Sequence, residues 1–283
     1  MTLALHPLAP NGAAFSVHPS TVIGIGALAA LYAWRARRGP AGGPTAPQKL
    51  SFAIGLAVLF LSLNGPLHDL SDGYLFTAHM VQHLVLTLLV PPLLIGGTPG
   101  WMLRPALEVP WVNAFARFVT RPFAAFSIFS ITMIAWHLPP LYNLAMAVHP
   151  VHIVEHLCFL VAATIMWWPV MSPMPELPRL PYGPQMLYVI GLALPMSVLA
   201  IVLTYADTVL YPAYAAAPRI WGITPLEDQR YGGLLMWLPG GLIFFAVASV
   251  RFFQWAAEEE RQSTEVDGSR QKPTEVDGSE VRR

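Results

Sequence analysis

Two histidine pairs are the residues of this sequence best suited to chemistry. His79 and His83 are four residues apart, as are His152 and His156, and both pairs lie in apolar stretches. On a helix, residues four apart lie on one face, about 6 Å apart along the axis. Neutral imidazole is the commonest metal ligand in proteins and binds copper, zinc and iron. The two pairs therefore predict a site for a metal ion or a cofactor.

Other potential ligands accompany the pairs. His137 ends another apolar stretch, and Glu155 lies inside the second pair. Glu155 either accepts a hydrogen bond from an imidazole or interacts with a helix dipole, and both interpretations stay open. The thioethers of Met80, Met146 and Met236 would favour Cu(I), although apolar packing is the simpler role for Met80 and Met236.

His68 and His149 are expected to be less directly involved, because they fall at the ends of apolar stretches. Pro150 predicts a helix that begins at that residue, with His149 just outside it. Ionisable residues inside a membrane span, in contrast, usually face the interior of a bundle and mark function. For the two pairs, the alternative to ligand binding is a hydrogen-bonded network that joins helices.

The composition indicates a membrane protein. Of the 283 residues, 55% are hydrophobic and 11% are charged, whereas about a quarter of a soluble domain is charged. The single cysteine, Cys158, excludes an internal disulfide and a Cys-x-x-Cys metal or redox motif. The first twenty residues have no basic segment ahead of an apolar one, so we expect no removable signal peptide.

Apolar runs long enough to cross a bilayer predict an all-α bundle of seven transmembrane helices. The expected spans are residues 21–34, 50–67, 74–95, 118–137, 151–170, 185–205 and 231–253. Pro91-Pro92 and Pro195 should kink or end the third and sixth helices. The domains expected are an extracytoplasmic segment (1–20), the membrane domain (21–253) and a disordered, charged cytoplasmic tail (254–283), in which Thr-Glu-Val-Asp-Gly-Ser occurs twice.

The basic residues predict the orientation of the bundle. Cytoplasmic loops of membrane proteins carry an excess of Lys and Arg. Alternate loops hold Arg35, Arg37, Arg38, Lys49, Arg104, Arg117, Arg121, Arg179 and Arg251, and the opposite loops hold Arg219 and Arg230. The N-terminus should therefore lie outside and the C-terminus in the cytoplasm, with the histidines in the outer third of the membrane. Residues 96–117 should lie along the inner interface, and residues 206–230 should fold partly back over the outer end.

Several motifs resemble one protein family. In order, they are His79-Met-Val-Gln-His83 before Pro91-Pro92, Trp136-His137-Leu-Pro139 with Tyr142-Asn143, His152-x-x-Glu155-His156 before Trp167-Trp168-Pro169, and Asp228-Gln229 with Gly232-Gly233 and Met236-Trp237. Over about residues 62–253, the sequence resembles the seven-helix, CtaG-type cytochrome c oxidase assembly family. The single-span copper chaperone that shares the name uses Cys-x-Cys, which is absent here.

The resemblance implies a role in maturing a haem–copper oxidase, through copper handling at the outer face of a bacterial cytoplasmic membrane. The partners it implies are lipid, an oxidase subunit and an extracytoplasmic copper donor, with no nucleic acid, and the role is that of an assembly factor rather than an enzyme. The metal ligands carried over are His79, His83, His137, His152 and His156, with Asp228 as a less certain partner. Copper binding, expected as Cu(I), is a hypothesis that also rests on the ligand chemistry above.

Two other functions stay open. Paired histidines on facing helices also suit a membrane cytochrome with bis-histidine haem ligation. A transporter or proton pathway could use the histidines and Asp207 as relay groups, but it should have ionisable groups through the inner half, where the sequence places none. A metal-activated water would allow hydrolysis on the outer side, yet no nucleophile motif accompanies it.

Overall fold

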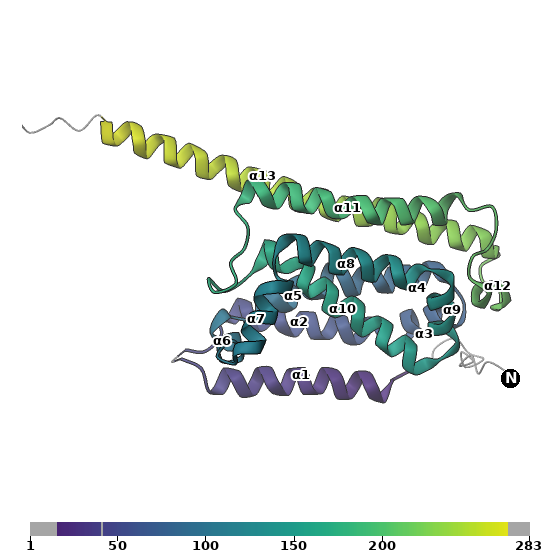
Figure 1. Cartoon of the computed structure of the whole chain (residues 1–283). Helices are drawn as coiled ribbons and strands as arrows, with labels where there is room; N and C mark the ends of the chain where they lie inside the picture. The colour runs from purple at the N-terminus through teal and green to yellow at the C-terminus, as the bar shows by residue number, and fades with distance from the viewer. Residues whose placement is uncertain (1–15, 41, 271–283) are drawn as a thin grey trace, which may run out of the picture.

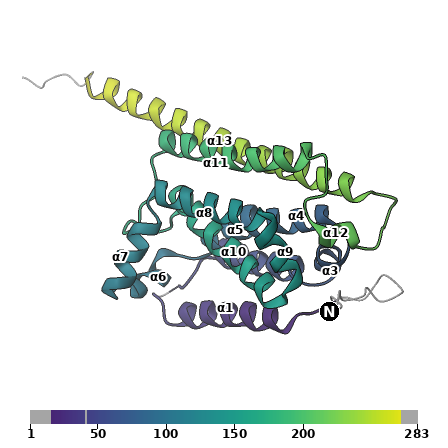
Figure 2. The same ribbon diagram turned by 45° about the vertical axis from the view of Figure 1, so that its right-hand side comes forward.

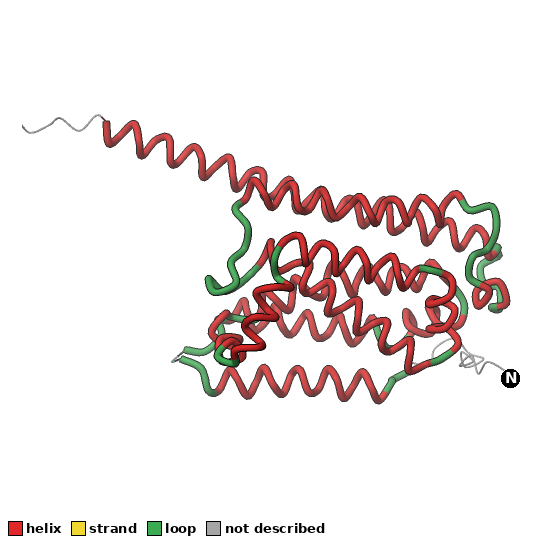
Figure 3. The backbone as a smooth tube through the Cα atoms, in the orientation of Figure 1, coloured by secondary structure: helices red, strands yellow, loops and turns green. Residues whose placement is uncertain are grey.

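The protein is an all-α helical bundle, as the composition predicts. A computed structural model describes residues 16–40 and 42–270, and within them Figure 3 shows helices joined by loops, without strands. Most long helices run along one direction, and α11 and α13 lie side by side along one flank in both views (Figures 1 and 2).

Most helices follow the predicted runs, but the second run, 50–67, is broken where α2 ends at Ser62 and α3 begins at Pro66. They are α1 (Pro19–Arg37), α2 (Ala46–Ser62), α3 (Pro66–Gly73), α4 (Phe76–Leu84), the π-helical segment η1 (Val85–Leu89), α5 (Val90–Gly97), α6 (Gly100–Leu107), α7 (Pro110–Val119), α8 (Pro122–His137), α9 (Pro139–Ala147), α10 (His149–Met171), α11 (Tyr182–Tyr205), α12 (Pro212–Ala216) and α13 (Pro225–Arg270). Helix α10 begins one residue earlier than expected, because Val148 rather than His149 is its N-cap and Pro150 lies in its first turn.

Four helical stretches are long and apolar enough to cross a membrane: Phe76–Gly97, His149–Met171, Tyr182–Tyr205 and Pro225–Glu265. Two bent pairs raise the number to six if each is one span: α2 with α3, bent by 41°, and α7 with α8, bent by 76°. The protein is therefore a multi-pass membrane protein. Helix α1 contains the first predicted run and lies beside α2 (Figure 1), but it is not among these candidate spans.

The third span does not end at Pro91-Pro92, although two adjacent prolines were expected to kink or end it. The chain stays helical from Phe76 to Gly97 and widens into η1 just before the prolines. Because Pro91 has no N–H, the carbonyl of Thr87 loses its helical donor. The indole Nε1 of Trp167 in α10 donates to that carbonyl at 2.9 Å. A neighbouring helix thus satisfies the group that proline leaves unpaired.

The sixth span is also uninterrupted, since Pro195 lies inside the continuous helix α11. The tail differs from the prediction too. Residues 254–270 continue α13 as a helix instead of forming a disordered segment, whereas 271–283 lie outside the described residues. Glu258, Glu259, Glu260 and Arg261 are strong helix formers, and they extend a helix that is already nucleated in the bundle.

The two longest connections lie at opposite ends of the bundle. Residues 96–117 form α6 and α7 at one end, and the 76° bend at Thr120–Arg121 turns α7 away from α8, as an interfacial segment requires. At the opposite end, the segment after α11 folds back over the bundle, as predicted. It includes α12 and buries Tyr211 and Tyr214 in the core.

Candidate metal centre

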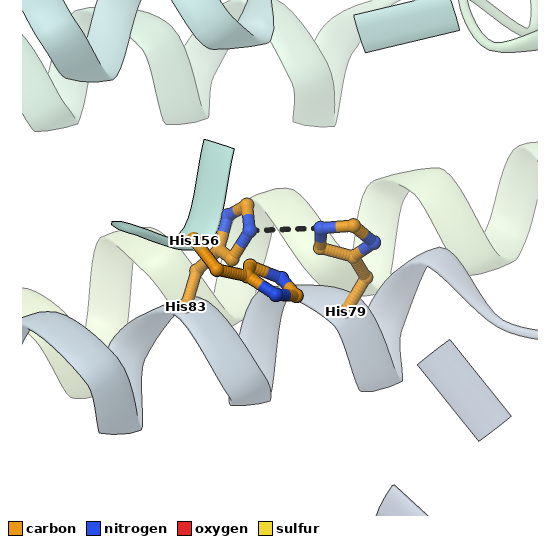
Figure 4. Close-up of side chains that lie close together, drawn as sticks. All are labelled: His79, His83 and His156. Carbon is orange, nitrogen blue, oxygen red and sulfur yellow. Dashed lines mark hydrogen bonds between the residues drawn. The ribbon is translucent and has the colours of Figure 1, made fainter. Parts of the chain in front are cut away.

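The two histidine pairs face each other inside the bundle. His79 lies in the first turn of α4 and His83 in its last turn, whereas His152 and His156 both lie in the first half of α10. The ring centroids of His79 and His152 are 5.3 Å apart, and those of His83 and His156 are 5.5 Å apart. Figure 4 shows His79, His83 and His156 gathered around one small volume. The predicted proximity of the pairs is therefore present.

Two overlapping groups have metal-binding geometry. One ligand atom from each of His79, His83 and His156 lies within 4.8 Å of the others, and the same holds for His79, His152 and Glu155. These residues are buried, and His79 and Glu155 are fully so. Metal–imidazole bonds of about 2 Å would bring such atoms together with small side-chain movements. We refer to His79, His83, His152, Glu155 and His156 as the outer cluster.

Glu155 is the most unusual member of the outer cluster. Its carboxylate is fully buried, and neither oxygen has a hydrogen-bond partner. The nearest imidazole nitrogens are Nε2 of His83, 3.8 Å from Oε1, and Nε2 of His152, 4.0 Å from Oε2. A buried carboxylate without a partner is costly, so Glu155 is either the neutral acid or is balanced by a positive charge at this point. Glu155 thus lies among the imidazoles, but it accepts a hydrogen bond from none of them.

Tyr214 fixes the tautomer of His79. The Tyr214 hydroxyl donates to the carbonyl of Ser71 at 2.7 Å, and burial raises the pKa of Tyr214 well above its usual value, so the phenol keeps its proton. Because the hydroxyl proton is donated to Ser71, the hydroxyl oxygen can only accept a hydrogen bond from His79. Nδ1 of His79, 2.9 Å from that oxygen, must therefore be the donor. His79 therefore presents the Nε2 lone pair to the outer cluster, as metal-binding histidines do.

The same reasoning assigns two more imidazoles. Nε2 of His83 lies 2.8 Å from the Nε2 lone pair of His79, so His83 is the donor and its Nδ1 carries a lone pair. His137, the last residue of α8, lies with Nδ1 2.7 Å from the carbonyl of Met133. A carbonyl only accepts, so the lone pair of His137 is on Nε2. The His137 ring is 5.8 Å from that of His83, and a third helix thus reaches the site.

Sequence reasoning underestimated His68 and missed Asp72. His68 was interpreted as an interfacial residue, yet it is buried, and its Nε2 lies 3.4 Å from Oδ2 of Asp72. The same carboxylate oxygen is 3.5 Å from Nδ1 of His152. Asp72 is partly exposed and so lies between the outer cluster and the surface. The available signal was the four-residue spacing of His68 and Asp72 on one short helix.

The remaining predicted residues lie elsewhere. Asp228 is buried in α13, where its carboxylate accepts the backbone N–H groups of Phe76 at 2.7 Å and Thr77 at 2.9 Å. It therefore caps α4, which carries His79 and His83, and does not reach the outer cluster itself. Met146 contacts the Tyr214 hydroxyl through sulfur at 3.8 Å. Met80 and Met236 line a small cavity next to His83.

His149 is exposed at the start of α10, with its ring 5.8 Å from that of His18. This position agrees with its interpretation as a residue at the rim of the helix. The residues that approach the centre of the site thus come from α4, α8 and α10. These helices correspond to the third, fourth and fifth predicted spans.

Comparisons with known proteins identify one protein family and several relatives. The family model for the cytochrome c oxidase caa3 assembly factor, Caa3_CtaG, matches residues 28–258. An uncharacterised protein of Mycobacterium bovis is 24% identical over 210 residues, which cover 68% of this chain and 32% of the relative. One of Mycobacterium leprae is 23% identical over 217 residues, with the same coverage.

The chain spans about a third of the length of these mycobacterial relatives. No solved structure matches. The family match, in contrast, includes the outer cluster, His137 and Asp228, and it extends over most of the described helices. The chain belongs to the cytochrome c oxidase caa3 assembly factor family.

Proposed function

We propose that this assembly factor binds copper in the outer cluster and delivers it to a subunit of a haem–copper oxidase. One observation carries the proposal: the Glu155 carboxylate is fully buried, has no hydrogen-bond partner and faces imidazoles of both helices. A metal ion held by His79, His83 and His156 would supply the missing positive charge.

The charge of the ligands favours Cu(I). Neutral imidazoles add no charge, so a monovalent ion beside one carboxylate gives a neutral site, which is the least costly state in an apolar interior. A divalent ion would need a second carboxylate, and Asp72, 3.5 Å from Nδ1 of His152, is not among the grouped ligands. Imidazole ligands also suit copper ions.

The position of the cluster supports delivery at one membrane face. His79 and Glu155 lie within two turns of the starts of α4 and α10, and His137 ends α8, so all three are at the same end of the bundle. Helices α3, α9 and α12 cover this end (Figure 1). With seven spans, α1 being the first, and the N-terminus outside, this end faces outward from a bacterial cytoplasmic membrane. The partly exposed Asp72 is then the entry point.

The packing supports copper over haem. The rings of the facing pairs are separated by between 5 and 6 Å, and the cavity beside His83 and His137 has a volume of about 20 Å³. A porphyrin between two histidines needs a slot far larger than that. The protein is therefore expected to be colourless, without a Soret band.

Metal analysis and absorption spectroscopy of the purified full-length protein test the proposal. Wild type should retain copper after dialysis, whereas His79→Ala and His156→Ala should each lose the copper of the outer cluster. His149→Ala is the matched control, because His149 is exposed at the start of the same helix as His156. Equal copper contents in wild type and both cluster variants, or a Soret band in place of copper, would contradict the proposal.

A further inference from the structure

The small cavity next to His83 lies on the interior side of the outer cluster. Its volume is about 20 Å³, and its lining includes His83, His137, Met80, Met133, Met196 and Met236. A cavity of about 10–15 Å³ already holds one water-sized particle. The cavity is therefore large enough for a single ion and too small for an organic cofactor.

Four methionines from four helices converge on this cavity. Met80 comes from α4, Met133 from α8, Met196 from α11 and Met236 from α13, and all four are buried. A methionine stripe along one helix is ordinary core packing, but thioethers that meet from four directions around an ion-sized space form a set of soft donors.

Two imidazole lone pairs accompany the thioethers. Nε2 of His137 carries a lone pair because Nδ1 donates to the Met133 carbonyl. Nδ1 of His83 carries one when Nε2 donates to His79. Both nitrogens are buried and have no hydrogen-bond partner. The cavity walls are otherwise apolar, apart from Thr87, whose hydroxyl donates to the His83 carbonyl.

We propose that this thioether cavity is a second Cu(I) site, with His83, His137 and the four methionines as candidate ligands. All of these ligands are neutral and most are soft, so the cavity selects a monovalent soft ion over Zn²⁺ or Cu²⁺. No counter-charge lines it, whereas the outer cluster holds Glu155.

His83 belongs to both ligand sets. Its Nε2 lies 2.8 Å from Nε2 of His79 and 3.8 Å from Oε1 of Glu155 in the outer cluster, and the same side chain lines the cavity. A neutral imidazole has one lone pair, so His83 ligates one copper ion at a time. Transfer of Cu(I) from Nε2 to Nδ1 breaks one Cu–N bond, forms the other and moves the ring proton from Nδ1 to Nε2, without a change of oxidation state. The route by which copper reaches the cavity rests on the proposed function of the outer cluster. The existence of the thioether site does not depend on it.

Anaerobic titration of the full-length protein with Cu(I), and separately with Ag(I), tests the inference, with X-ray absorption to detect sulfur ligands. Wild type should bind a second equivalent of Cu(I), and its X-ray absorption spectrum should show copper–sulfur bonds. Met133→Leu/Met196→Leu should lose that equivalent and the sulfur signal. Met166→Leu is the matched control, since Met166 is a fully buried core methionine outside the cavity lining.

The two proposals fail in different ways. His79→Ala and His156→Ala should still bind the copper ion that has sulfur ligands. If wild type binds only that ion, the outer cluster is not a copper site. The absence of a copper–sulfur signal in fully loaded wild type overturns the thioether site. That spectrum is recorded on wild type, so the test does not depend on the folding of Met133→Leu/Met196→Leu. If the folded double variant binds as much Cu(I) as wild type, the thioether site is also overturned.

Discussion

The hydroxyl of Tyr214 lies 2.9 Å from Nδ1 of His79, across 135 residues of sequence. This contact connects α12, in the segment that covers one end of the bundle, to the outer cluster. Tyr214 also receives a hydrogen bond from the Tyr142 hydroxyl at 3.1 Å. The covering segment therefore determines which nitrogen of His79 is free to bind a metal.

Tyr214→Phe should weaken copper binding without unfolding the protein. The ring that packs in the core is kept, but the acceptor for the His79 Nδ1–H is lost. Removal of such an outer hydrogen-bond partner typically lowers metal affinity about 10–100-fold, measurable by competition with a Cu(I) chelator. Tyr188→Phe is the control, because its hydroxyl donates to the Met166 carbonyl, away from the site. Equal affinities in both variants would show that Tyr214 only packs.

Glu155→Gln should separate copper binding from folding. The substitution keeps the shape and removes the buried charge, so the metal-free variant should melt at the same temperature as wild type or higher. Copper at about 100 times its dissociation constant should stabilise wild type by about 2.7 kcal/mol. In the variant, most of this copper-dependent shift in melting temperature should vanish, and chelation should then have little effect.

The control for Glu155 is Glu176→Gln. The Glu176 carboxylate accepts a hydrogen bond from Arg104 at 2.6 Å near the protein surface, remote from the outer cluster. The copper-dependent shift should stay at its wild-type size in this variant. A full copper-dependent shift in Glu155→Gln would instead show that the carboxylate does not balance the metal.

The helices and the two histidine pairs could be predicted from sequence because the signals are local. Four-residue spacing inside an apolar run places His79 with His83 and His152 with His156 on single helix faces. That these faces meet followed from the rarity of ionisable residues in lipid. Tyr214 could not be assigned, because its proximity to His79 depends on how the loop after α11 folds back.

Asp228 and Pro91 show a second limit of the sequence. Asp228 was expected near the metal, whereas it caps α4 from another helix. The prolines predicted a kink or an early end. The helix does not end there, because Trp167 donates to the carbonyl of Thr87, a contact that sequence alone does not reveal. In both cases a long-range polar contact satisfies backbone groups that local rules leave unpaired.

Asp228→Ala should destabilise the bundle but leave its ligands in place. Two backbone N–H groups at the start of α4 lose their acceptor, and removal of a helix cap typically costs about 0.5–2 kcal/mol. The melting temperature of the metal-free protein should fall, while the folded fraction binds copper with wild-type stoichiometry. A loss of copper at unchanged stability would instead identify Asp228 as a ligand. Asp207→Ala serves as the control, because Asp207 is exposed in the loop after α11.

Gly233→Ala should separate α13 from α11 and destabilise the protein. A Cβ atom at Gly233 would lie 2.5 Å from Oγ1 of Thr204 and 3.0 Å from the carbonyl oxygen of Ala200, so the helices must move apart. Overpacking of this kind typically costs about 1–3 kcal/mol. The effect should appear as a lower melting temperature in thermal unfolding of the detergent-solubilised protein.

Gly241→Ala, in the same helix, is the matched control. Apart from the helix's own backbone, no atom lies within 4 Å of the position that a Cβ would take at Gly241, and alanine is favoured over glycine in a helix by about 1 kcal/mol. This variant should be as stable as wild type or more so. Because both substitutions change helix propensity equally, a difference between them measures the close approach of α13 to α11. Equal melting temperatures for the two variants would show that α11 and α13 do not need this contact.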